Sequence, residues 1–581
     1  MDDDNLSFKN LFVPLTNKKV FCFLAIIGFF VYFNALFNFF VWDEFPYILY
    51  NTELHKFDVI KFFGKNLFNS ELSGFYRPVG VTYLSFLYNV FGWHSFFYHL
   101  IQVVLHILAA GLLYYLFQKY INKIASFYLS VFFLIHPIQV ESVAYIGGLA
   151  SGLVYLFGVI PMLLSYKKVH TWLTSLVIVL FLLLGLLTKE SGFMFPPLIF
   201  FLCYFIQKRK LLISLCYSIV PFAIYFLLRF FVAGVYFLST KDTNVYIQHL
   251  PLLGRMANMP AIFFYYIKTL IFPDKLSLGQ LWVIKSIDIP NFYLPLLIDI
   301  LFVILIVVIG YYTFKLKRKL FVIYIFFLFW YLGGMVVMMQ IFPVDMTVAD
   351  RWYYLPFAGL LGILGIGASL VKVKNKNTMT LIHTFLIIGI ILLSVRTIVR
   401  NSNWHDNLTL FGHDSKVLTN FDIENSLGAE LASRKLYKEA LPHLVKSVEL
   451  YSHDTSLYNL GFVYEQLGDY KNAKKYYIET IKTRKDNSNR EEIMVNAYNG
   501  MSRVLLLHDT PENASSFLKE AVKIYPSDST YWSYLALSLY KLNEYNASLD
   551  AATKAVKLKP DSATKNMYQK ILNREEIKLR Y

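Results

Sequence analysis

The sequence predicts an all-α protein: a polytopic bundle of membrane helices followed by a solenoid of stacked helical repeats. Three observations predict this fold class. Of the 581 residues, 56% are hydrophobic and only 16% are charged, whereas a soluble protein usually carries about 25% charged residues. Long apolar runs fill the first 400 residues. Beyond them the apolar runs stop, and a helical periodicity with an internal repeat begins.

About eleven apolar runs have the length of membrane helices, which need roughly 20 residues each. The first run lacks a small-residue cleavage site and exceeds a signal-peptide core, so we expect a retained span. A run near 258–272 is short and is followed by FPDKLSLGQ, so we expect a re-entrant or surface helix there; a spanning helix is the open alternative. The eleven runs lie near 20–41, 94–117, 124–140, 148–165, 171–187, 192–207, 211–232, 293–314, 319–341, 352–371 and 379–399.

Basic residues outnumber acidic ones 55 to 39, and their positions explain the excess. In the first 400 residues they cluster between apolar runs, which is the pattern of short cytoplasmic loops. The membrane therefore accounts for the basicity, and we exclude nucleic-acid binding. With Lys18 and Lys19 in the cytoplasm, alternation puts every cluster inside and the C-terminal region outside. The other clusters are Lys119 with Lys123, Lys167 with Lys168, Lys208 to Lys210, Lys315 to Lys319 and Lys372 to Lys376.

Three cysteines, Cys22, Cys203 and Cys216, lie in apolar runs without metal-ligand spacing. They predict no disulfide framework and leave the redox compartment open.

The C-terminal region contains four helical repeats that start near 421, 454, 495 and 529. Their spacings are about 33, 41 and 34 residues, and the longest carries the polar insert TRKDNSNREE. This pattern resembles the tetratricopeptide repeat, whose period is about 34 residues. Such repeats are mainly an interaction surface. We therefore predict a membrane domain over 1–400, a linker over 401–420 and a repeat domain over 421–571.

Ionisable residues other than loop lysines gather on the predicted outer side of the membrane. Asp43 and Glu44 follow the first span, where charge at membrane depth is costly, and four further polar segments share their side. This convergence predicts an active site at the membrane surface. The four segments are YRPV (Tyr76 to Val79), HPIQVES (His136 to Ser142), TKES (Thr188 to Ser191) and DRWYYLP (Asp350 to Pro356).

Each of these segments also has a plain interpretation. Asp43 and Glu44 are either a solvated helix end or a general base that takes a proton from an acceptor hydroxyl. Arg77 either precedes a proline that starts the next helix or offers its planar fork of donors to a phosphate. His136 is more often a satisfied interfacial residue than a metal ligand, because its spacing specifies no metal.

The remaining two segments are equally ambiguous. Lys189 and Glu190 either form a polar turn between spans or pair near a ligand. The aromatic residues after Arg351 suit an interfacial belt, while Arg351 itself could hold a leaving phosphate.

The order of these motifs resembles a known family. FVWDE, YRPV, FYHLIQVVLH (Phe97 to His106), HPIQVESVAYI, LLTKES, DRWYYLP and RNSNWHDNLTLF (Arg400 to Phe411), followed by tetratricopeptide repeats, are similar to the transmembrane and tetratricopeptide-repeat-containing O-mannosyltransferases and their bacterial relatives. These belong to the multi-span glycosyltransferases of the GT-C fold, which use lipid phosphosugars. The resemblance covers nearly the whole chain.

The resemblance implies that a polyprenyl-phosphate sugar donates its sugar on the extracytoplasmic face, with inversion, and that an acidic residue of the first outer loop is the base. That acid falls at Asp43, with Glu44 second. Two departures are a glutamine, Gln139, for the second His of HPxHxE, and GLAS, with Leu149 and Ser151, for Gly-Arg-Ala-Asp. The other matching residues are Arg77, Lys189 and Arg351 for the donor phosphate, and Tyr76, His136, Glu141, Glu190, Asp350 and Tyr354 elsewhere in the site.

The predicted function is thus transfer of mannose or another hexose to an acceptor hydroxyl, on protein Ser or Thr, by an integral membrane enzyme. The membrane is the plasma membrane in a bacterium and the endoplasmic reticulum in a eukaryote. We assign no metal ligands and expect the lipid-linked sugar as co-substrate; a divalent cation stays open. There is no Rossmann-type glycine fingerprint for a nucleotide. The repeats are expected to meet a protein acceptor or partner.

Two alternatives remain at this stage. One is a transferase of the same class that modifies a glycan or lipid. The other is a transporter or membrane scaffold with a repeat tail, although paired inverted halves and broken helices at mid-bilayer are not evident. Sugar, acceptor, metal requirement, organism and oligomeric state stay open, and the sequons at Asn407, Asn513 and Asn546 matter only in a host that glycosylates secreted proteins.

Overall fold

The computed structural model describes residues 15–65, 74–167, 171–236, 245–483 and 491–577. Among these residues the regular elements are helices, apart from one isolated antiparallel β-bridge between Gln280 and Val348. The all-α prediction is therefore confirmed. The chain forms two compact units, Met1–Leu418 and Thr419–Tyr581. Two features named above, Lys168 and residues 484–490 of the polar insert, lie outside the described residues.

The first unit is a bundle of long apolar helices joined by short helical turns. Local sequence sets where many of them begin: the side chains of Thr16, Asn122 and Thr171 each accept a hydrogen bond from a first-turn amide. The elements are α2 (Asn17–Tyr32), η2 (Phe33–Phe37), η3 (Phe45–Leu49), η4 (Leu54–Lys56), α3 (Val59–Phe63), α4 (Pro78–Phe91), α5 (Ser95–Phe117), α6 (Lys123–Ile135), η5 (Pro137–Gln139), α7 (Val140–Ala144), η6 (Ile146–Leu149), α8 (Ala150–Leu164), α9 (Trp172–Thr188), η7 (Glu190–Met194), α10 (Phe195–Phe201), η8 (Leu202–Ile206), α11 (Leu211–Leu227), η9 (Leu228–Val232), α12 (Tyr246–His249), α13 (Leu252–Ile271), η10 (Ile289–Tyr293), α14 (Leu294–Leu316), α15 (Arg318–Met338), η11 (Asp350–Tyr353), α16 (Tyr354–Ala368), α17 (Lys376–Asn403) and α18 (Asn407–Val417).

Seven of the described helices are long and apolar enough to cross a membrane, or eight if the bent pair of α6 with Pro137–Ala144 is one span. The chain is thus an integral membrane protein. All eleven apolar runs are helical, but the count of about eleven spans is not shown, because several helices are too short. Trp172–Thr188 and Glu190–Ile206 are shorter apolar helices, and α16 has only 15 residues. The 20-residue helix α13, over the ambiguous run, is not among the seven.

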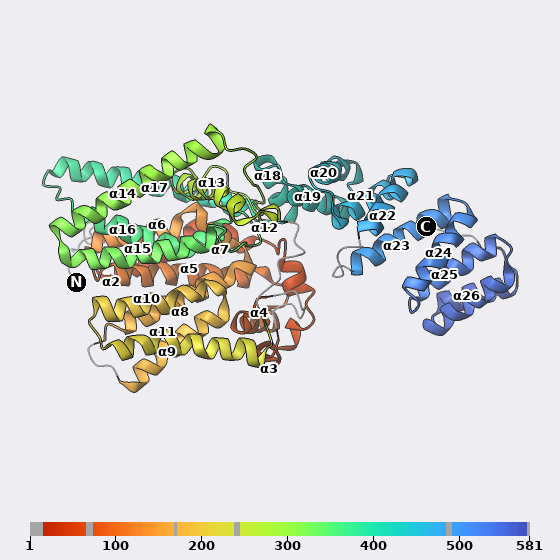
Figure 1. Ribbon diagram of the computed structural model, residues 1–581, viewed down its shortest axis with the longest axis horizontal. Coiled ribbons are helices and arrows are strands. Elements are labelled where there is room, and N and C mark those ends of the chain that lie inside the picture. The colour runs from red at the N-terminus through yellow and green to blue at the C-terminus, as the bar shows by residue number, and fades with distance from the viewer. Residues whose placement is uncertain (1–14, 66–73, 168–170, 237–244, 484–490, 578–581) are drawn as a thin grey trace, which may run out of the picture. The chain divides into compact units, whose positions relative to one another are not determined.

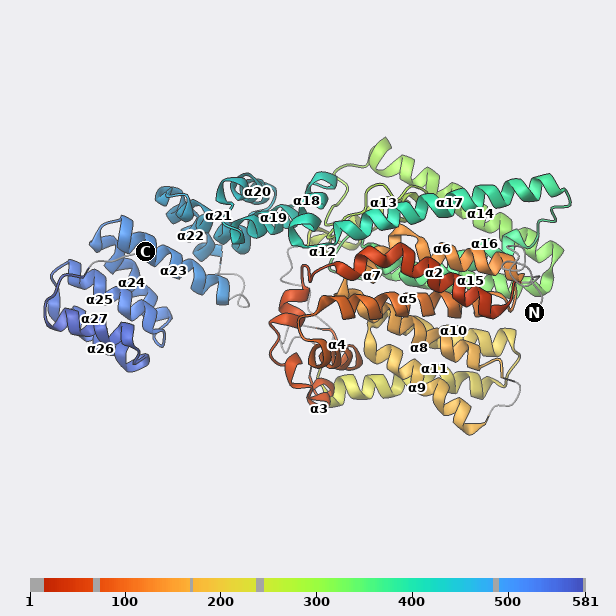
Figure 2. The ribbon, with the colours of Figure 1, turned by 180° about the vertical axis from the view of Figure 1, so that it is seen from behind.

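The two ends of the bundle carry different kinds of connection. Figures 1 and 2 show the turn between α14 and α15 and the loop between α16 and α17 at one end, where lysine clusters lie in the sequence. At the other end lie α3, α4, α12 and α18. The polar segments that the sequence analysis singled out belong to connections at this second end.

Residues 401–418, expected as a linker, fall within the first unit and include α18. A buried carboxylate holds them there. Asp414 of α18 is fully buried and accepts hydrogen bonds from the Leu278 amide at 2.6 Å and from Arg400 at 3.0 Å. Because one-sided loss of a buried ion pair is strongly destabilising, α18 is anchored to the bundle.

The second unit is a series of antiparallel helix pairs, with first helices that begin close to the predicted repeat starts. Small residues let the paired helices approach: a Cβ on Gly428 would lie 2.5 Å from the Leu444 side chain, and Ala440 and Ala473 are fully buried. The helices are α19 (Phe421–Ser433), α20 (Tyr437–Leu450), α21 (Asp454–Gln466), α22 (Tyr470–Thr483), α23 (Glu491–His508), α24 (Pro511–Ile524), α25 (Ser529–Lys541), α26 (Tyr545–Leu558) and α27 (Ser562–Leu572).

Candidate functional site

The turn that carries Asp43 has a strained backbone. Trp42 has φ of 52°, a left-handed conformation that is unfavourable for a bulky residue. Its amide donates a hydrogen bond of 2.8 Å to Oδ1 of Asn407, and the neighbouring amide of Phe39 donates to the His405 carbonyl at 2.8 Å. The start of α18 and the residues before it therefore hold the loop that carries Asp43 in this conformation.

The two adjacent carboxylates of this turn lie in different environments. Glu44 is completely buried and accepts hydrogen bonds from the amides of Val41 at 2.7 Å and Ile146 at 2.5 Å. Burial raises the pKa of Glu44 to about 8, against the opposing effect of these hydrogen bonds. Asp43, by contrast, is only half-buried. Glu44 thus joins the turn to the start of η6, and Asp43 is the carboxylate with access to a ligand.

Asp43 also lies among the other candidate residues. Burial, and secondly the charge of Asp43, raises the pKa of both Tyr47 and Tyr145. The Trp42 ring lies 5.4 Å from the Tyr145 ring and 5.7 Å from the guanidinium carbon of Arg351. The residue beside Asp43 is therefore in contact with Arg351, although 309 residues (351 − 42) separate Arg351 from Trp42 in sequence.

Arg351 and Glu141 form a buried ion pair between η11 and α7. Arg351 Nη1 contacts Glu141 Oε1, and the Arg351 amide donates to Glu141 Oε2 at 2.9 Å. Their side chains are 9% and 3% exposed, so neither charge is compensated by bulk water. The pair fixes the DRWYYLP segment against HPIQVES, and the Trp352 ring covers the guanidinium at 5.9 Å.

A second ion pair, more exposed than the first, joins Arg77 to Glu190. Arg77 Nε lies 2.8 Å and Nη2 lies 2.5 Å from Glu190 Oε2. The approach depends on Gly80, in the first turn of α4, because a Cβ there would lie 2.8 Å from the Thr188 carbonyl oxygen. The side chains of Arg77 and Glu190 are 24% and 34% exposed, which leaves them accessible to a ligand.

Lys189 connects the two ion pairs electrostatically. Desolvation, followed by the charges of Arg77 and Arg351, lowers its pKa to about 7, and Glu190 and Glu141 act in the opposite direction. Its ammonium group donates a hydrogen bond of 3.2 Å to Ser151 Oγ, a neutral partner. Lys189 has no carboxylate partner among the described residues, and a phosphate placed near it would supply that negative charge.

Asp350, the first residue of the DRWYYLP segment, is buried. The Tyr265 hydroxyl, from α13, donates to Asp350 Oδ1 at 2.6 Å, and Gln280 donates to the Tyr265 oxygen at 2.8 Å. Burial, with the nearby charge of Glu141, raises the pKa of Asp350 to about 7. This network attaches α13 to η11, so Asp350 has a structural role in the site: it helps to hold the DRWYYLP segment in place.

Three other predicted site residues have their polar atoms satisfied within the protein. His136 Nδ1 accepts from the Ile138 amide at 3.2 Å, and Nε2 donates to the Leu270 carbonyl at 3.1 Å. The Tyr76 hydroxyl donates to the Phe63 carbonyl at 2.9 Å. Tyr354 lies 2.9 Å from Nδ1 of His106, inside the bundle. This is the plain interpretation of each residue, and it favours structural roles.

Sequence reasoning missed several contributors. Asn407 lies in RNSNWHDNLTLF, a segment that resembles the family but to which no role was assigned. Tyr265 lies in no motif that would mark it as a site residue. Ser151 was noted only as a departure, yet it is the partner of Lys189. Gln139 is fully buried, and its amide atoms have no hydrogen-bond partner among the described residues. Within the described part of the chain, no group of three or more His, Cys, Asp or Glu side chains could hold a metal ion.

Comparisons with known proteins found a repeat family and distant relatives that match most of the chain. Residues 452–527 match a family model described as tetratricopeptide repeat. The chain is 25% identical over 461 residues to protein O-mannosyl-transferase F38B6.6 of Caenorhabditis elegans, which covers 75% of this chain and 63% of that protein. It is 23% identical over 597 residues to protein O-mannosyl-transferase TMTC3 of Mus musculus, which covers 92% of this chain and 63% of that protein.

Among solved structures, the crystal structure of ArnT from Cupriavidus metallidurans bound to undecaprenyl phosphate is similar over 78% of this chain and 79% of that chain. The sequence identity is 13% and the TM-score is 0.39. The matches to both curated relatives span 63% of their length. The resemblance that the motifs predicted is confirmed: the chain is a distant relative of the transmembrane and tetratricopeptide-repeat-containing protein O-mannosyltransferases.

Proposed function

We propose that this protein is an inverting glycosyltransferase that moves a sugar from a polyprenyl-phosphate carrier to an acceptor hydroxyl at the membrane surface. The observation that carries the proposal is the grouping of the half-buried carboxylate of Asp43 with three cationic side chains from distant segments. Arg77, Lys189 and Arg351 influence one another or a shared neighbour electrostatically, and Arg351 contacts the residue beside Asp43.

In the proposed reaction, the Asp43 carboxylate takes the proton of the acceptor hydroxyl as the hydroxyl oxygen bonds to the anomeric carbon. The bond between that carbon and the phosphate oxygen breaks, and the lipid phosphate leaves with the electron pair. Lys189 and Arg77 balance the charge of the leaving phosphate, because both are accessible or half-buried. Arg351 is neutralised by Glu141 and orients the turn through Trp42.

The names of the curated relatives support mannose as the sugar and protein Ser or Thr as the acceptor. The repeats of the second unit then serve as the contact surface for a protein acceptor. We propose that the site and the repeats are extracytoplasmic and that the N-terminus is cytoplasmic. In this arrangement about eleven helices cross the membrane, and the shorter apolar helices complete the bundle between the candidate spans.

The test is a transfer assay on the full chain reconstituted in vesicles. Polyprenyl-phosphate mannose is supplied with a Ser/Thr-rich peptide, and both released polyprenyl phosphate and mannosylated peptide are measured. We expect wild-type turnover and a loss of about a hundredfold or more in Asp43→Asn, which keeps the shape but not the base. Equal turnover of the two proteins would remove Asp43 as the base. Absence of turnover with every polyprenyl-phosphate hexose would end the proposal.

A further inference from the structure

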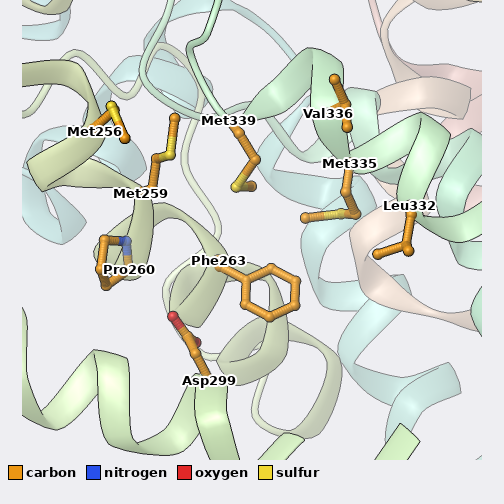
Figure 3. A pocket seen from close by; sticks show the side chains of 9 residues that line it. All are labelled: Met256, Met259, Pro260, Phe263, Asp299, Leu332, Met335, Val336 and Met339. Atoms are coloured by element: carbon orange, nitrogen blue, oxygen red, sulfur yellow. The ribbon is translucent and has the colours of Figure 1, made fainter. Parts of the chain in front are cut away.

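A groove separate from the candidate site lies between α13, α14 and α15. Its volume is about 380 Å³. Figure 3 shows side chains of α13 and α15 on either side of it, with Asp299 of α14 among them. All of its lining residues except Asp299 are apolar, and four are methionines: Met256, Met259, Met335 and Met339. Methionine is flexible and polarisable, so such a lining adapts to irregular apolar ligands.

The groove adjoins a candidate membrane span that is largely exposed. It lies on α14, whose helix is part of the most hydrophobic candidate span, Ile289–Leu316, with a mean hydropathy of 3.0. Only 17% of the 18-residue apolar window of that span is buried inside the protein, and Leu297, Ile300 and Leu301 are 54%, 47% and 56% exposed. We therefore expect a molecule that enters the groove to arrive from the bilayer.

Asp299 is the polar exception in this lining. It is 6% exposed, and its Oδ1 has no hydrogen-bond partner among the described residues. Buried polar groups are almost always paired, and a carboxyl inside a membrane span usually marks a functional site. The missing partner is a hydrogen-bond donor that the described chain does not supply.

The residues that line the groove limit which class of ligand can bind there. A lipid phosphate is excluded because the one ionisable group here is acidic, whereas the candidate donor site is cationic. A hydroxyl both donates and accepts, so it can pair with either protonation state of a carboxyl. A hydroxyl is also uncharged, so its burial avoids the large desolvation cost that an ammonium group would incur. A neutral lipid with a small hydroxyl head and an apolar body fits these conditions.

We infer that this groove binds a neutral, hydroxyl-bearing membrane lipid, whose hydroxyl donates a hydrogen bond to Asp299 while its chain packs against the methionines. The inference does not depend on the proposed transfer reaction. It adds a second lipid site to the protein, distinct from the site for a phosphate-bearing donor.

The experiment measures lipid retention by native mass spectrometry of the full chain in detergent. The probes are dioleoylglycerol, its methyl ether, which has the same chains but no donor, and the corresponding primary amine. We expect the wild type to retain the alcohol about tenfold more tightly than the ether, as one hydrogen bond predicts. Equal retention of alcohol and ether, or tighter retention of the amine than of the alcohol, would overturn the assignment.

Variants make the test specific to Asp299. Asp299→Leu should retain alcohol and ether equally, while Asp299→Asn, which keeps an acceptor oxygen, should keep part of the preference. Thr313→Val removes a buried hydroxyl farther along α14, where Thr313 donates to the Ile309 carbonyl, and should leave the preference unchanged. In lipid-free detergent Asp299→Leu should unfold at the same or a higher temperature than wild type, because it removes an unpaired buried polar group. A persisting alcohol preference in Asp299→Leu refutes the inference.

Discussion

The Trp42 amide donates a 2.8 Å hydrogen bond to Asn407 Oδ1, across 365 residues of sequence. The bond holds a left-handed residue immediately before the candidate base, Asp43. Residues at the start of α18 thus control the direction in which Asp43 points.

Asn407→Ala removes the acceptor of this bond. We expect the transition temperature to fall slightly, since one hydrogen bond contributes about 1 kcal/mol. The kcat of sugar transfer should fall about ten- to hundredfold, because small misplacement of a catalytic group is costly, with little change in the KM for the donor. Asn407→Asp keeps an acceptor oxygen and should restore much of the rate. Asn513→Ala, at a sequon in the second unit, is the control; equal kcat in wild type and Asn407→Ala would contradict the positioning role.

We expect Glu44→Gln to lower the stability of the protein rather than to remove the catalytic base. The side chain accepts two backbone amide hydrogen bonds, from Val41 and Ile146, one on each carboxylate oxygen. In glutamine an NH₂ group replaces one of these oxygens and cannot accept a hydrogen bond, so one of the two amides loses its partner. We expect a loss of about 1–3 kcal/mol in unfolding free energy, measured by thermal denaturation in detergent. The protein that remains folded should retain a measurable rate, unlike Asp43→Asn. A stable but inactive Glu44→Gln protein would reverse the two assignments.

The two ion pairs should respond differently to loss of their acids. Glu141→Gln leaves Arg351 buried without a counter-charge and should cost about 3–5 kcal/mol in stability. Glu190→Gln leaves the partly exposed Arg77 in contact with water and should cost less than about 1 kcal/mol. The double variant Glu141→Leu/Arg351→Met removes both buried charges and should recover stability without activity. Denaturation of all three proteins under one detergent condition checks the order, and equal losses in the two single variants would contradict it.

We expect the KM for the donor to depend on pH through the charge of Lys189. Its lowered pKa of about 7 means that the ammonium charge is present below pH 7 and is lost as pH rises above it. Donor KM should therefore rise above pH 7. Ser151→Asp places a carboxylate beside Lys189, raises its pKa and should move this limb of the KM profile to higher pH. Ser151→Asn is the neutral control, and a profile that is the same in both variants would rule out Lys189 as the titrating group.

The proposed orientation can be tested with single cysteines in a background that lacks Cys22, Cys203 and Cys216. Lys374 is exposed between α16 and α17, and Lys523 is exposed in the repeats, with 70% of its side chain accessible. A membrane-impermeant maleimide added to sealed vesicles whose extracytoplasmic face points outward should label Lys523→Cys and not Lys374→Cys. The opposite pattern would invert the topology, and labelling of neither site before permeabilisation would place both in the cytoplasm.

The sequence predicted the elements of this fold better than their ends. Each apolar run is helical, because hydrophobic length is a sufficient signal, but α16, with 15 residues, is shorter than its run. Helix α4 is not among the predicted spans, because its 14 residues fall below the length that a span needs. Pro78 is its first residue, as the plain interpretation of YRPV predicts.

The sequence predicted which residue types form the candidate site, but it could not predict the role of each residue. Adjacent carboxylates are equivalent in sequence, and only the turn at Trp42 buries Glu44 and leaves Asp43 half-buried. The pairings of Arg77 with Glu190 and of Arg351 with Glu141 depend on helix packing over more than 100 residues of separation, which no local pattern encodes. Contributions from Asn407 and Tyr265 are missed for the same reason.

The anchoring of Asp414 by Leu278 and Arg400 sets where this protein can be divided. Removal or exchange of the repeats at residue 400 would also remove Asn407 and Asp414. The membrane unit would then lose the hydrogen bond from Trp42 to Asn407, which holds the loop that carries Asp43. A swap made between Leu418 and Thr419 keeps both residues. Chimaeras joined at that point are therefore the ones in which a change of acceptor preference can be attributed to the repeats alone.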